Sequence, residues 1–345
     1  MAKKKISIKD IAKSLKISIT TVSFILNGKA KEKRISDELI RKVEDYIRET
    51  GYKPSHLAQS LRLGKSKIIV FMVEDISNHF FASIARLIEE KAFENGYKII
   101  YCSTENDPGK ARDLIGTFKA RNVDGFIITP TPDLESEIQN LLEEDFAVMV
   151  FDRKVPQLPC SYVVVENHQS AFDATEHLVS QGCTQIGLVH VESEQMQMVD
   201  RLMGYREAIQ KHGLSENVLF VPFHNFTLNE GVGLIRDFLR ERSDLDAVFT
   251  STNYLAFETL QAIHQLDKKI PQDFAFVSFD DHYFFSLYQP NITAIEQPLE
   301  LIANKLMGGM LELMKENGAS KPVISETLPT KLHLRSSSMA IVNEL

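Results

Sequence analysis

The sequence predicts an N-terminal all-α helix-turn-helix module followed by a two-lobed α/β body with parallel sheets. Residues 1–67 hold 17 Lys+Arg and 7 Asp+Glu, a net charge of +10, whereas the remaining 278 residues hold 22 and 40, a net charge of −18. From Lys67 onward, short apolar runs alternate with stretches at helical spacing, which is typical of repeated βα units. A small basic module on a large acidic body indicates a nucleic-acid reader joined to a second function.

Length and composition limit the remaining possibilities. The 345 residues are enough for two or three folded units, and 43% hydrophobic content is sufficient for full cores. The three cysteines show neither metal-ligand nor disulfide spacing, which suits a reducing compartment. The N-terminal MAKKK leads into an amphipathic helix instead of a signal peptide, and no apolar run approaches the ~18 residues of a membrane span. We therefore expect a cytoplasmic protein without membrane contact.

A helix, a tight turn and a second helix are predicted within residues 8–28. Ser7 is the expected N-cap of the first helix, and Ser18 is the expected N-cap of a second helix that ends before Gly28. The second helix has an apolar face formed by Val22, Ile25 and Leu26. Its opposite face carries short polar side chains and one aromatic ring, namely Thr20, Ser23, Phe24 and Asn27. Such a face fits a DNA major groove.

A third helix is predicted from about Asp37 to Thr50. Its apolar residues, Ile40, Val43, Tyr46 and Ile47, would close a three-helix core.

The stretch TVSFILNG, followed by GYKPSHLAQSLRLGKSK, resembles the LacI/GalR family of transcription repressors. The resemblance implies that Pro54 starts a hinge helix and that Leu61 wedges into the minor groove at the operator centre. An ordinary linker leucine is the alternative for Leu61. Lys and Arg residues of this segment are expected to touch phosphates. The residues expected to contact DNA are Ser18, Ile19, Thr20, Thr21, Ser23, Phe24, Asn27, Lys53, Leu61 and Arg62.

The chain departs from the family's pattern at two places in this module. Members usually carry arginine, a guanine reader, where this chain has Phe24. A phenylalanine ring can touch a thymine methyl instead, so we expect a different operator half-site; packing of Phe24 inside the module is the alternative. The loop Lys29–Arg34 is also longer than in most members.

Two sets of strands are predicted in the body. The first set comprises IIVFMV, KIIYCS, GFIITP and AVMVFD, and the second comprises YVVVE, IGLVHV, VLFVPF, AVFTST and FAFVSFD. Two parallel sheets make two lobes, with a ligand crevice at the carboxyl ends of their strands.

The family resemblance extends through this body, over residues 5–338. It rests on SNHFFASI, ENGYKI, NVDGFII, FDR, DRLMGYREA, AVFTSTNYLA, IPQDFAFVSFDD and TAIEQP, in this order and spacing. It implies a body like that of periplasmic sugar-binding proteins, with three crossings between the lobes, near Val164, Gln297 and Thr330. The expected parts are a DNA-binding domain (1–52), a hinge and linker (53–66), an N-terminal lobe (67–164 with 297–329) and a C-terminal lobe (165–296 with 330–338).

The family's motifs also imply an effector site in the crevice. Phe80 and Phe81 would stack on a sugar ring, whereas core packing is their alternative. Arg201, Asn253 and Asp280 match polar ligand contacts. A surface ion pair is the alternative for Arg201, and a turn or helix cap is the alternative for Asp280.

Arg153, in FDR, raises the question of a phosphorylated effector. Together with Arg201 it could form a fork for phosphate, whereas a salt bridge to a carboxylate is its alternative. The loop NGKAKEKRIS, CSTENDP, FDR and the turn at Thr250–Thr252 resemble the fructose repressor branch, whose ligands are phosphorylated fructose. The chain departs from that branch elsewhere, for example at His224. A neutral mono- or oligosaccharide is the competing hypothesis.

Sequence motifs for catalysis are missing from the chain. No GxSxG, GxxxxGK[ST], HExxH or glycine-rich dinucleotide fingerprint occurs, and we expect no enzyme, cofactor or metal. The favoured hypothesis is a sugar- or sugar-phosphate-regulated transcriptional repressor that binds a near-palindromic operator as a homodimer. Ligand releases DNA for most family members and acts as a corepressor for some. A sugar-transport receptor or sensor, and a sugar-processing enzyme, are the alternatives.

Overall fold

The computed structural model describes residues 6–52, 65–223, 230–315 and 321–339. They belong to two units, residues 1–67 and residues 68–345. Lys53, Pro54, Leu61 and Arg62, for which a hinge is predicted, and also His224 lie outside the described residues. Within the described part of the chain, no helix is long and apolar enough to cross a bilayer.

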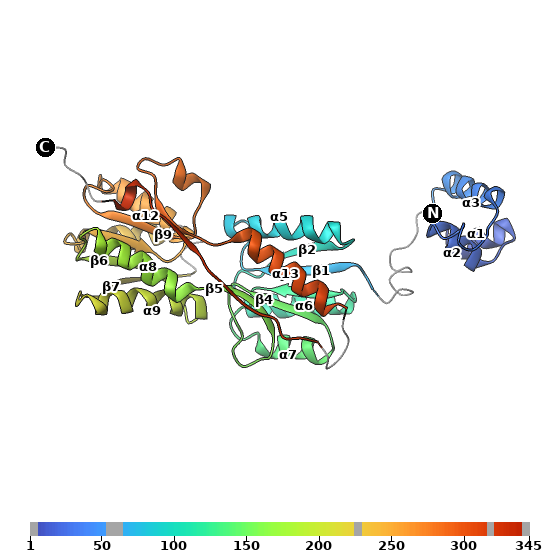
Figure 1. Ribbon diagram of the computed structural model, residues 1–345, viewed down its shortest axis with the longest axis horizontal. Helices are drawn as coiled ribbons and strands as arrows, with labels where there is room; N and C mark the ends of the chain where they lie inside the picture. The colour runs from blue at the N-terminus through green and yellow to red at the C-terminus, as the bar shows by residue number, and fades with distance from the viewer. Residues whose placement is uncertain (1–5, 53–64, 224–229, 316–320, 340–345) are drawn as a thin grey trace. The chain divides into compact units, whose positions relative to one another are not determined.

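Three helices form the N-terminal module, at the positions that the sequence predicts: α1 (Ile8–Leu15), α2 (Ile19–Leu26) and α3 (Asp37–Thr50) (Figure 1). A capping box starts α1, because the Ser7 hydroxyl accepts from the Asp10 N–H while the Asp10 carboxylate accepts from the Ser7 N–H. The chain leaves α2 through Gly28, whose φ of +69° favours glycine. A small core holds the helices together and comprises Ile11, Ala12, Val22, Ile25, Ala30 and Val43.

The first lobe of the body is built on a parallel sheet in the order β11-β5-β4-β3-β1-β2. Its strands are β1 (Ile68–Val73), β2 (Lys98–Ser103), β3 (Gly125–Ile128), β4 (Ala147–Phe151), β5 (Ser161–Val165) and β11 (Ser325–Leu328). Helices α5 (His79–Glu94) and α13 (Leu299–Leu313) cover one face, while α6 (Pro108–Ala120) and α7 (Glu135–Glu143) cover the other (Figure 1). The strands are therefore buried on both faces, which explains their continuous apolar runs.

The second lobe repeats this architecture around a sheet in the order β12-β10-β9-β8-β6-β7. Its strands are β6 (Ile186–Glu192), β7 (Asn217–Pro222), β8 (Ala247–Thr250), β9 (Ala275–Phe279), β10 (Thr293–Glu296) and β12 (Lys331–His333), the last of them antiparallel to β10. Helices α8 (Asn167–Ser180) and α9 (Met196–Lys211) pack on one face, while α11 (Gly231–Glu241) and α12 (Asn253–Gln265) pack on the other. Short 3-10 turns, η1 (Tyr283–Ser286) and η3 (Ser336–Ser338), follow β9 and β12.

The chain passes between the two sheets after β5, after β10 and after β11. One strand assignment from the sequence is wrong: YVVVE forms β5, which pairs with β4 and β11 in the first sheet instead of starting the second. The error has a physical reason, because an apolar run reveals that a strand is buried but not which strand it pairs with. The residue boundaries proposed for the lobes remain predictions.

Candidate functional site

The outer face of α2 presents polar side chains to solvent. Val22 and Ile25 are buried in the core of the module, whereas Thr20 and Asn27 are exposed and Ser23 is half-buried. The Asn27 amide donates to the Ser23 carbonyl, which fixes its orientation at the end of the helix. At the start of the helix, Ser18 and the 45%-exposed Ile19 are also exposed, and Thr21 is half-buried. This face of the module is therefore free of core packing.

Phe24 lies on the same face and is half-buried without belonging to the core of the module. The Lys33 ammonium lies 5.4 Å from the centroid of its ring. The alternative of Phe24 as a core residue is therefore not what the structure shows. The loop Lys29–Arg34, singled out for its length, supplies this cation.

In the body, the six predicted effector residues line one cavity of about 50 Å³ between the lobes. Phe80, Phe81 and Arg153 come from the first lobe, and Arg201, Asn253 and Asp280 come from the second. Arg153 and Asp280 follow the carboxyl ends of β4 and β9, where a parallel sheet places its ligand site. The cavity brings these residues together but leaves their role in binding a prediction.

The two phenylalanines pack in the core of the first lobe and also line the cavity. Phe80 and Phe81 are 8% and 5% exposed, and both belong to the core of the first lobe. Their rings meet edge to face at 5.0 Å, and Phe81 meets Phe151 in the same way at 6.2 Å. They also line the cavity, so core packing holds them rigidly at its wall.

Arg153 is 4% exposed and fully engaged with the protein. Its Nη2 donates to Glu74 Oε2 at 2.7 Å, its Nη1 donates to Asn106 Oδ1 at 3.0 Å, and its Nε lies 3.3 Å from Asp152 Oδ2. The salt-bridge alternative for Arg153 therefore describes its state in this structure. A phosphate would have to compete with two carboxylates for the guanidinium.

Arg201 occupies the other side of the cavity and is 2% exposed. It donates to Asn167 Oδ1 at 2.9 Å and to the Ser251 carbonyl at 2.7 Å, and its Nη1 lies 3.7 Å from Asp280 Oδ2. The guanidinium carbon stacks 3.5 Å from the centroid of the Phe279 ring. Burial lowers the pKa of Arg201, and the Asp280 carboxylate counteracts that shift.

Asp280 is held by neighbours as well as by Arg201. The Gln297 amide donates to its Oδ1 at 2.6 Å. Burial raises the pKa of the Asp280 carboxyl, and the positive charge of Arg201 opposes the rise. Its φ of +67° places it in a strained turn after β9, which is a common property of functional residues.

Sequence reasoning missed several polar residues of the same cavity: Glu74, Asn78, Asp152, Gln197 and Gln297. A signal was available for two of them, because Glu74 and Asp152 directly follow β1 and β4. The Asn78 amide donates to Asn253 Oδ1 at 3.1 Å across the two lobes. Gln197 is 3% exposed, and its Oε1 has no hydrogen-bond partner among the described residues.

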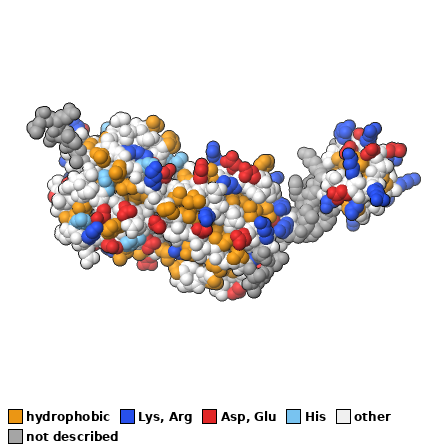
Figure 2. Space-filling view, in the orientation of Figure 1, with side chains coloured by type: hydrophobic (Ala, Val, Ile, Leu, Met, Phe, Trp, Pro, Cys, Tyr) orange, Lys and Arg blue, Asp and Glu red, His pale blue; other side chains and the backbone are white. Residues whose placement is uncertain are grey.

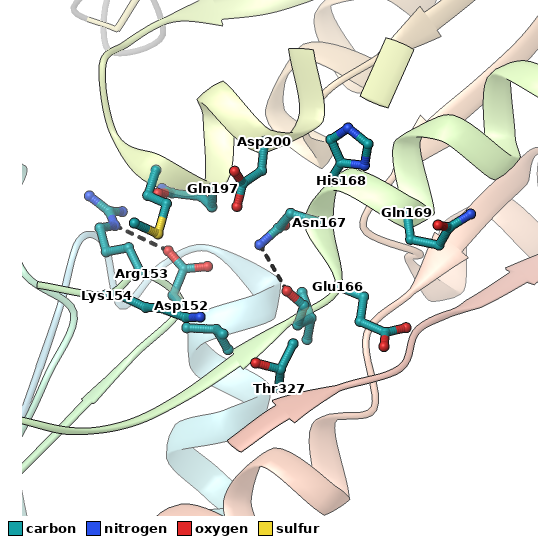
Figure 3. Close-up of a pocket in the computed structure, with 13 residues that line it drawn as sticks. Asp152, Arg153, Lys154, Glu166, Asn167, His168, Gln169, Gln197, Asp200 and Thr327 are labelled. Atoms are coloured by element: carbon teal, nitrogen blue, oxygen red, sulfur yellow. Dashed lines mark hydrogen bonds and ion pairs between the residues drawn. The ribbon is translucent and has the colours of Figure 1, made fainter. Parts of the chain in front are cut away.

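A second, larger pocket of about 330 Å³ lies beside the crossovers and shares Asp152, Arg153 and Gln197 with the cavity (Figure 3). Figure 3 shows Asp200, Asn167 and Glu166 around it. Burial raises the pKa of the Asp200 carboxyl. Its lining within the described residues includes no Phe or Tyr that could stack on a sugar. The smaller cavity is therefore the better candidate for a ring-shaped ligand.

Metal chemistry finds no support in the described part of the chain. No group of three or more His, Cys, Asp or Glu side chains there is arranged to hold a metal ion.

Comparisons with known proteins give both parts of the chain a family. Residues 7–55 match the family model described as "Bacterial regulatory proteins, lacI family", and residues 175–338 match a "Periplasmic binding protein-like domain". The ribose operon repressor of Halalkalibacterium halodurans is 31% identical over 340 residues, which cover 96% of this chain and 97% of the relative.

Two solved structures share the fold. The lac repressor dimer bound to operator and the anti-inducer ONPF matches with a TM-score of 0.83 at 21% identity, covering 98% of this chain and all of that one. A LacI family regulator from Enterococcus faecium with bound ribose matches with a TM-score of 0.71 at 23% identity, covering 79% of this chain and 99% of that one. With its helix-turn-helix module, its two-lobed body and its full-length similarity to a repressor, this chain belongs to the LacI family of bacterial transcriptional regulators.

Proposed function

We propose that the protein is a homodimeric repressor of carbohydrate metabolism genes, and that a neutral monosaccharide in the interlobe cavity switches its affinity for operator DNA. The names of relatives support a sugar: one is a ribose operon repressor, and another was solved with ribose. The observation that carries the choice of a neutral ligand is the pairing of both arginines in the cavity.

The charges of the cavity disfavour a phosphorylated sugar. Its lining holds three carboxylates, Glu74, Asp152 and Asp280, against two guanidinium groups, Arg153 and Arg201. Both guanidinium groups already have carboxylate neighbours within 4 Å. A phosphate dianion would meet these carboxylates without an unpaired cation to offset the repulsion. The sugar-phosphate hypothesis is therefore the weaker one.

Neutral hydroxyls fit the same lining. Carboxylate and amide oxygens accept hydrogen bonds from hydroxyls, and the amides of Asn253 and Gln297 can donate to them. The Gln197 Oε1, which has no hydrogen-bond partner among the described residues, is a buried acceptor that a ligand hydroxyl would satisfy. The rings of Phe80 and Phe81 would contact the apolar face of the sugar.

Ligand entry requires the lobes to separate. A cavity of about 50 Å³ has room for only a few water molecules, since one water needs about 10–15 Å³. Contacts across the lobes close it, including Asn78 with Asn253 and the Gln195 amide with Asn106 Oδ1 at 3.2 Å. A sugar that binds the closed form better than the open form shifts this equilibrium, typically by ~1–3 kcal/mol.

On the DNA side, we propose that α2 enters the major groove. Two modules of a dimer would meet half-sites about one helical turn apart on a near-palindromic operator. The contacts proposed for Lys53, Leu61 and Arg62 remain predictions, since these residues lie outside the described part of the chain.

A thermal-shift panel on the full chain tests the ligand. D-ribose is compared with ribose 5-phosphate, which is confined to open-chain and furanose forms. D-glucose and glucose 6-phosphate, which share the pyranose ring, form the matched pair, and fructose 1-phosphate and fructose 1,6-bisphosphate extend the panel. A ligand that binds the folded state raises the melting temperature with its concentration. We expect a shift with ribose and none with the phosphates. A shift with the phosphates alone would overturn the neutral ligand.

Operator binding is tested separately. Fluorescence anisotropy with a duplex selected by the protein from a randomised library would be measured with and without the active sugar. A change in operator affinity of about fivefold or more is expected from the coupling energy given above. An unchanged affinity would show that the cavity does not regulate DNA binding.

A further inference from the structure

The helix proposed to enter the major groove carries no charged side chain. Residues 19–26 read ITTVSFIL, so α2 itself offers neither Lys nor Arg to a base. A cation beside its outer face comes from the following loop, where Lys33 places its ammonium 5.4 Å from the centroid of the Phe24 ring. This distance is within the ~6 Å over which a cation is attracted by an aromatic face.

Backbone contacts fix the loop that carries Lys33. The Lys29 N–H donates to the Phe24 carbonyl at 2.9 Å, and the Lys33 N–H donates to the Lys29 carbonyl at 3.2 Å. Ala30 is buried in the module's core, and its carbonyl accepts from the Ile35 N–H at 3.0 Å. The loop therefore continues the packed structure of α2, and the Lys33 side chain reaches the Phe24 ring from a backbone that is fixed.

The four basic residues of the loop differ in their surroundings. Lys29, Lys31, Lys33 and Arg34 are all exposed, and Lys and Arg side chains are visible on the surface of the module in Figure 2. Of these, Lys33 is the one whose contact with an aromatic ring is resolved. A lysine that points freely into solvent neutralises phosphates without reading sequence. A lysine held over a groove-facing ring has a defined place relative to the bases.

We propose that Phe24 and Lys33 act as one base-reading unit. The ring of Phe24 holds the Lys33 ammonium at the outer face of α2, where it donates to O6 and N7 of a guanine, while the ring edge touches a neighbouring pyrimidine. Lysine suits this contact, because guanine presents two acceptors in the major groove. The inference rests on the proposed binding of operator DNA by α2.

Matched variants separate base reading from phosphate binding. The wild-type chain first selects an operator from a randomised duplex library; its affinity is then measured for that operator, for single base-pair changes and for unrelated DNA. Lys31→Ala is the control, because Lys31 is an exposed lysine of the same loop. It should weaken all duplexes alike and reduce the salt slope by about 0.9 for each phosphate that the variant no longer neutralises.

Lys33→Ala should instead lower the ratio of operator to unrelated affinity by about tenfold, with the loss confined to one base pair in each half-site. Changing that base pair should then have no further effect. Phe24→Leu should weaken the preference at the same base pair. Adding Lys33→Ala to Phe24→Leu should lower the ratio of operator to unrelated affinity only slightly further, because the two residues act together. Lys33→Arg should retain the preference for that base pair, because arginine also donates to O6 and N7 of guanine. Retention would show that the loss in Lys33→Ala is not caused by unfolding of the module.

Three outcomes would overturn the proposed base-reading unit. If Lys33→Ala weakens all duplexes equally, as Lys31→Ala does, Lys33 binds phosphate and the unit does not exist. Additive losses from Phe24→Leu and Lys33→Ala would also overturn it. If the wild-type chain selects no sequence from the library, the proposed function fails, and this inference fails with it.

Discussion

The module and the body each place a cation on an aromatic ring, and they do so in opposite ways. In the module, the exposed Lys33 lies 5.4 Å from the Phe24 ring centroid on the surface. In the body, Arg201 is 2% exposed and lies 3.5 Å from the Phe279 centroid. The module keeps its charge available to a large anionic partner, whereas the body uses its charge to hold other side chains around a small cavity.

The ion pair at the cavity differs in the same way from the pair in the module. In the module, Arg48 and Asp45 form a pair in which the side chains are 79% and 61% exposed. In the body, Arg153 and Glu74 are 4% and 9% exposed. Exposed pairs contribute about 0–1 kcal/mol, whereas removing one partner of a buried pair leaves an uncompensated charge. Removing Arg153 or Glu74 should therefore cost the body more stability than removing Arg48 or Asp45 costs the module.

The largest effect is expected for Arg201→Ala. The substitution leaves Asp280 and Asn167 without their partner and opens a hole above Phe279. Truncating one partner of a buried, hydrogen-bonded charge pair costs about 2 kcal/mol or more, so effector affinity should fall at least about 30-fold in calorimetric titrations.

Arg206→Ala is the control for this prediction. Arg206 lies on the same helix, and its pair with Glu216 is about two-fifths exposed, so effector affinity should change by less than about twofold. A full effector response in the Arg201→Ala variant would show that the cavity is not the effector site.

Replacing a buried carboxyl that has no hydrogen-bond partner among the described residues should stabilise the fold, in contrast to the loss expected for Arg201→Ala. Glu258 on α12 is 8% exposed, its Oε2 has no partner among the described residues, and burial raises its pKa to about 7. Because this pKa lies above that of the unfolded chain, the carboxyl favours folding at low pH, and this contribution is lost as the pH rises through about 7. Glu258→Gln should therefore stabilise the body at pH 8 by about 3 kcal/mol, since each pKa unit corresponds to about 1.4 kcal/mol.

Calorimetric melting temperatures at pH 8 and pH 5 test this expectation. The stabilising effect should be large at pH 8 and should nearly vanish at pH 5, where the wild-type carboxyl is protonated. Equal effects at both pH values would mean that Glu258 has a partner in solution.

These contacts also explain what the sequence revealed and what it did not. The helices of the module were predictable because Ser7, Ser18 and Gly28 mark their ends within a few residues of the apolar pattern. Arg153 was singled out because FDR ends a predicted strand, whereas Asp280 was assigned from its match to the family's motif. Those signals are local.

Long-range pairing could not be predicted in the same way. Glu74 lies 79 positions before the Arg153 that it neutralises, and no local pattern joins them. The same reason applies to β5, whose apolar run fits either sheet, and to Lys33, whose place over Phe24 depends on the fold of a loop. The charge balance of the cavity, on which the proposal of a neutral ligand rests, depends on such long-range contacts.

A smaller effect is expected from the loss of a helix cap, and its size should differ between the module and the first lobe because their cores differ in size. Ser7→Ala removes the capping box of α1, and Asp107→Ala removes the cap of α6, where the Asp107 carboxylate accepts from the Lys110 N–H at 3.0 Å. Each loss costs about 1 kcal/mol. The module's core is small, so hydrogen exchange of α1 amides should accelerate about fivefold in Ser7→Ala.

In Asp107→Ala, amides of α6 beyond its first turn should change less, because the helix packs on the extended core of the first lobe. Similar acceleration in both variants would contradict the idea that core size sets the tolerance.

The smallest effect is expected from two histidines that meet across the lobes. The rings of His79, on α5, and His282, before η1, lie 4.4 Å apart edge to face. Burial lowers the pKa of His282, His79 lowers it further, and Asp281 opposes both. The closed form therefore binds fewer protons than an open form in which the rings separate, so acid favours opening.

Effector affinity should weaken about threefold as the pH falls from 7.5 to 5.5, across the usual histidine pKa of about 6.5. In calorimetric titrations, His79→Gln should reduce this pH dependence while leaving the affinity at pH 7.5 unchanged, because a neutral side chain there meets no repulsion at either pH. A pH dependence of the same size in His79→Gln would place its origin in the burial of His282, which is the larger cause of its lowered pKa, and not in the repulsion between the two rings.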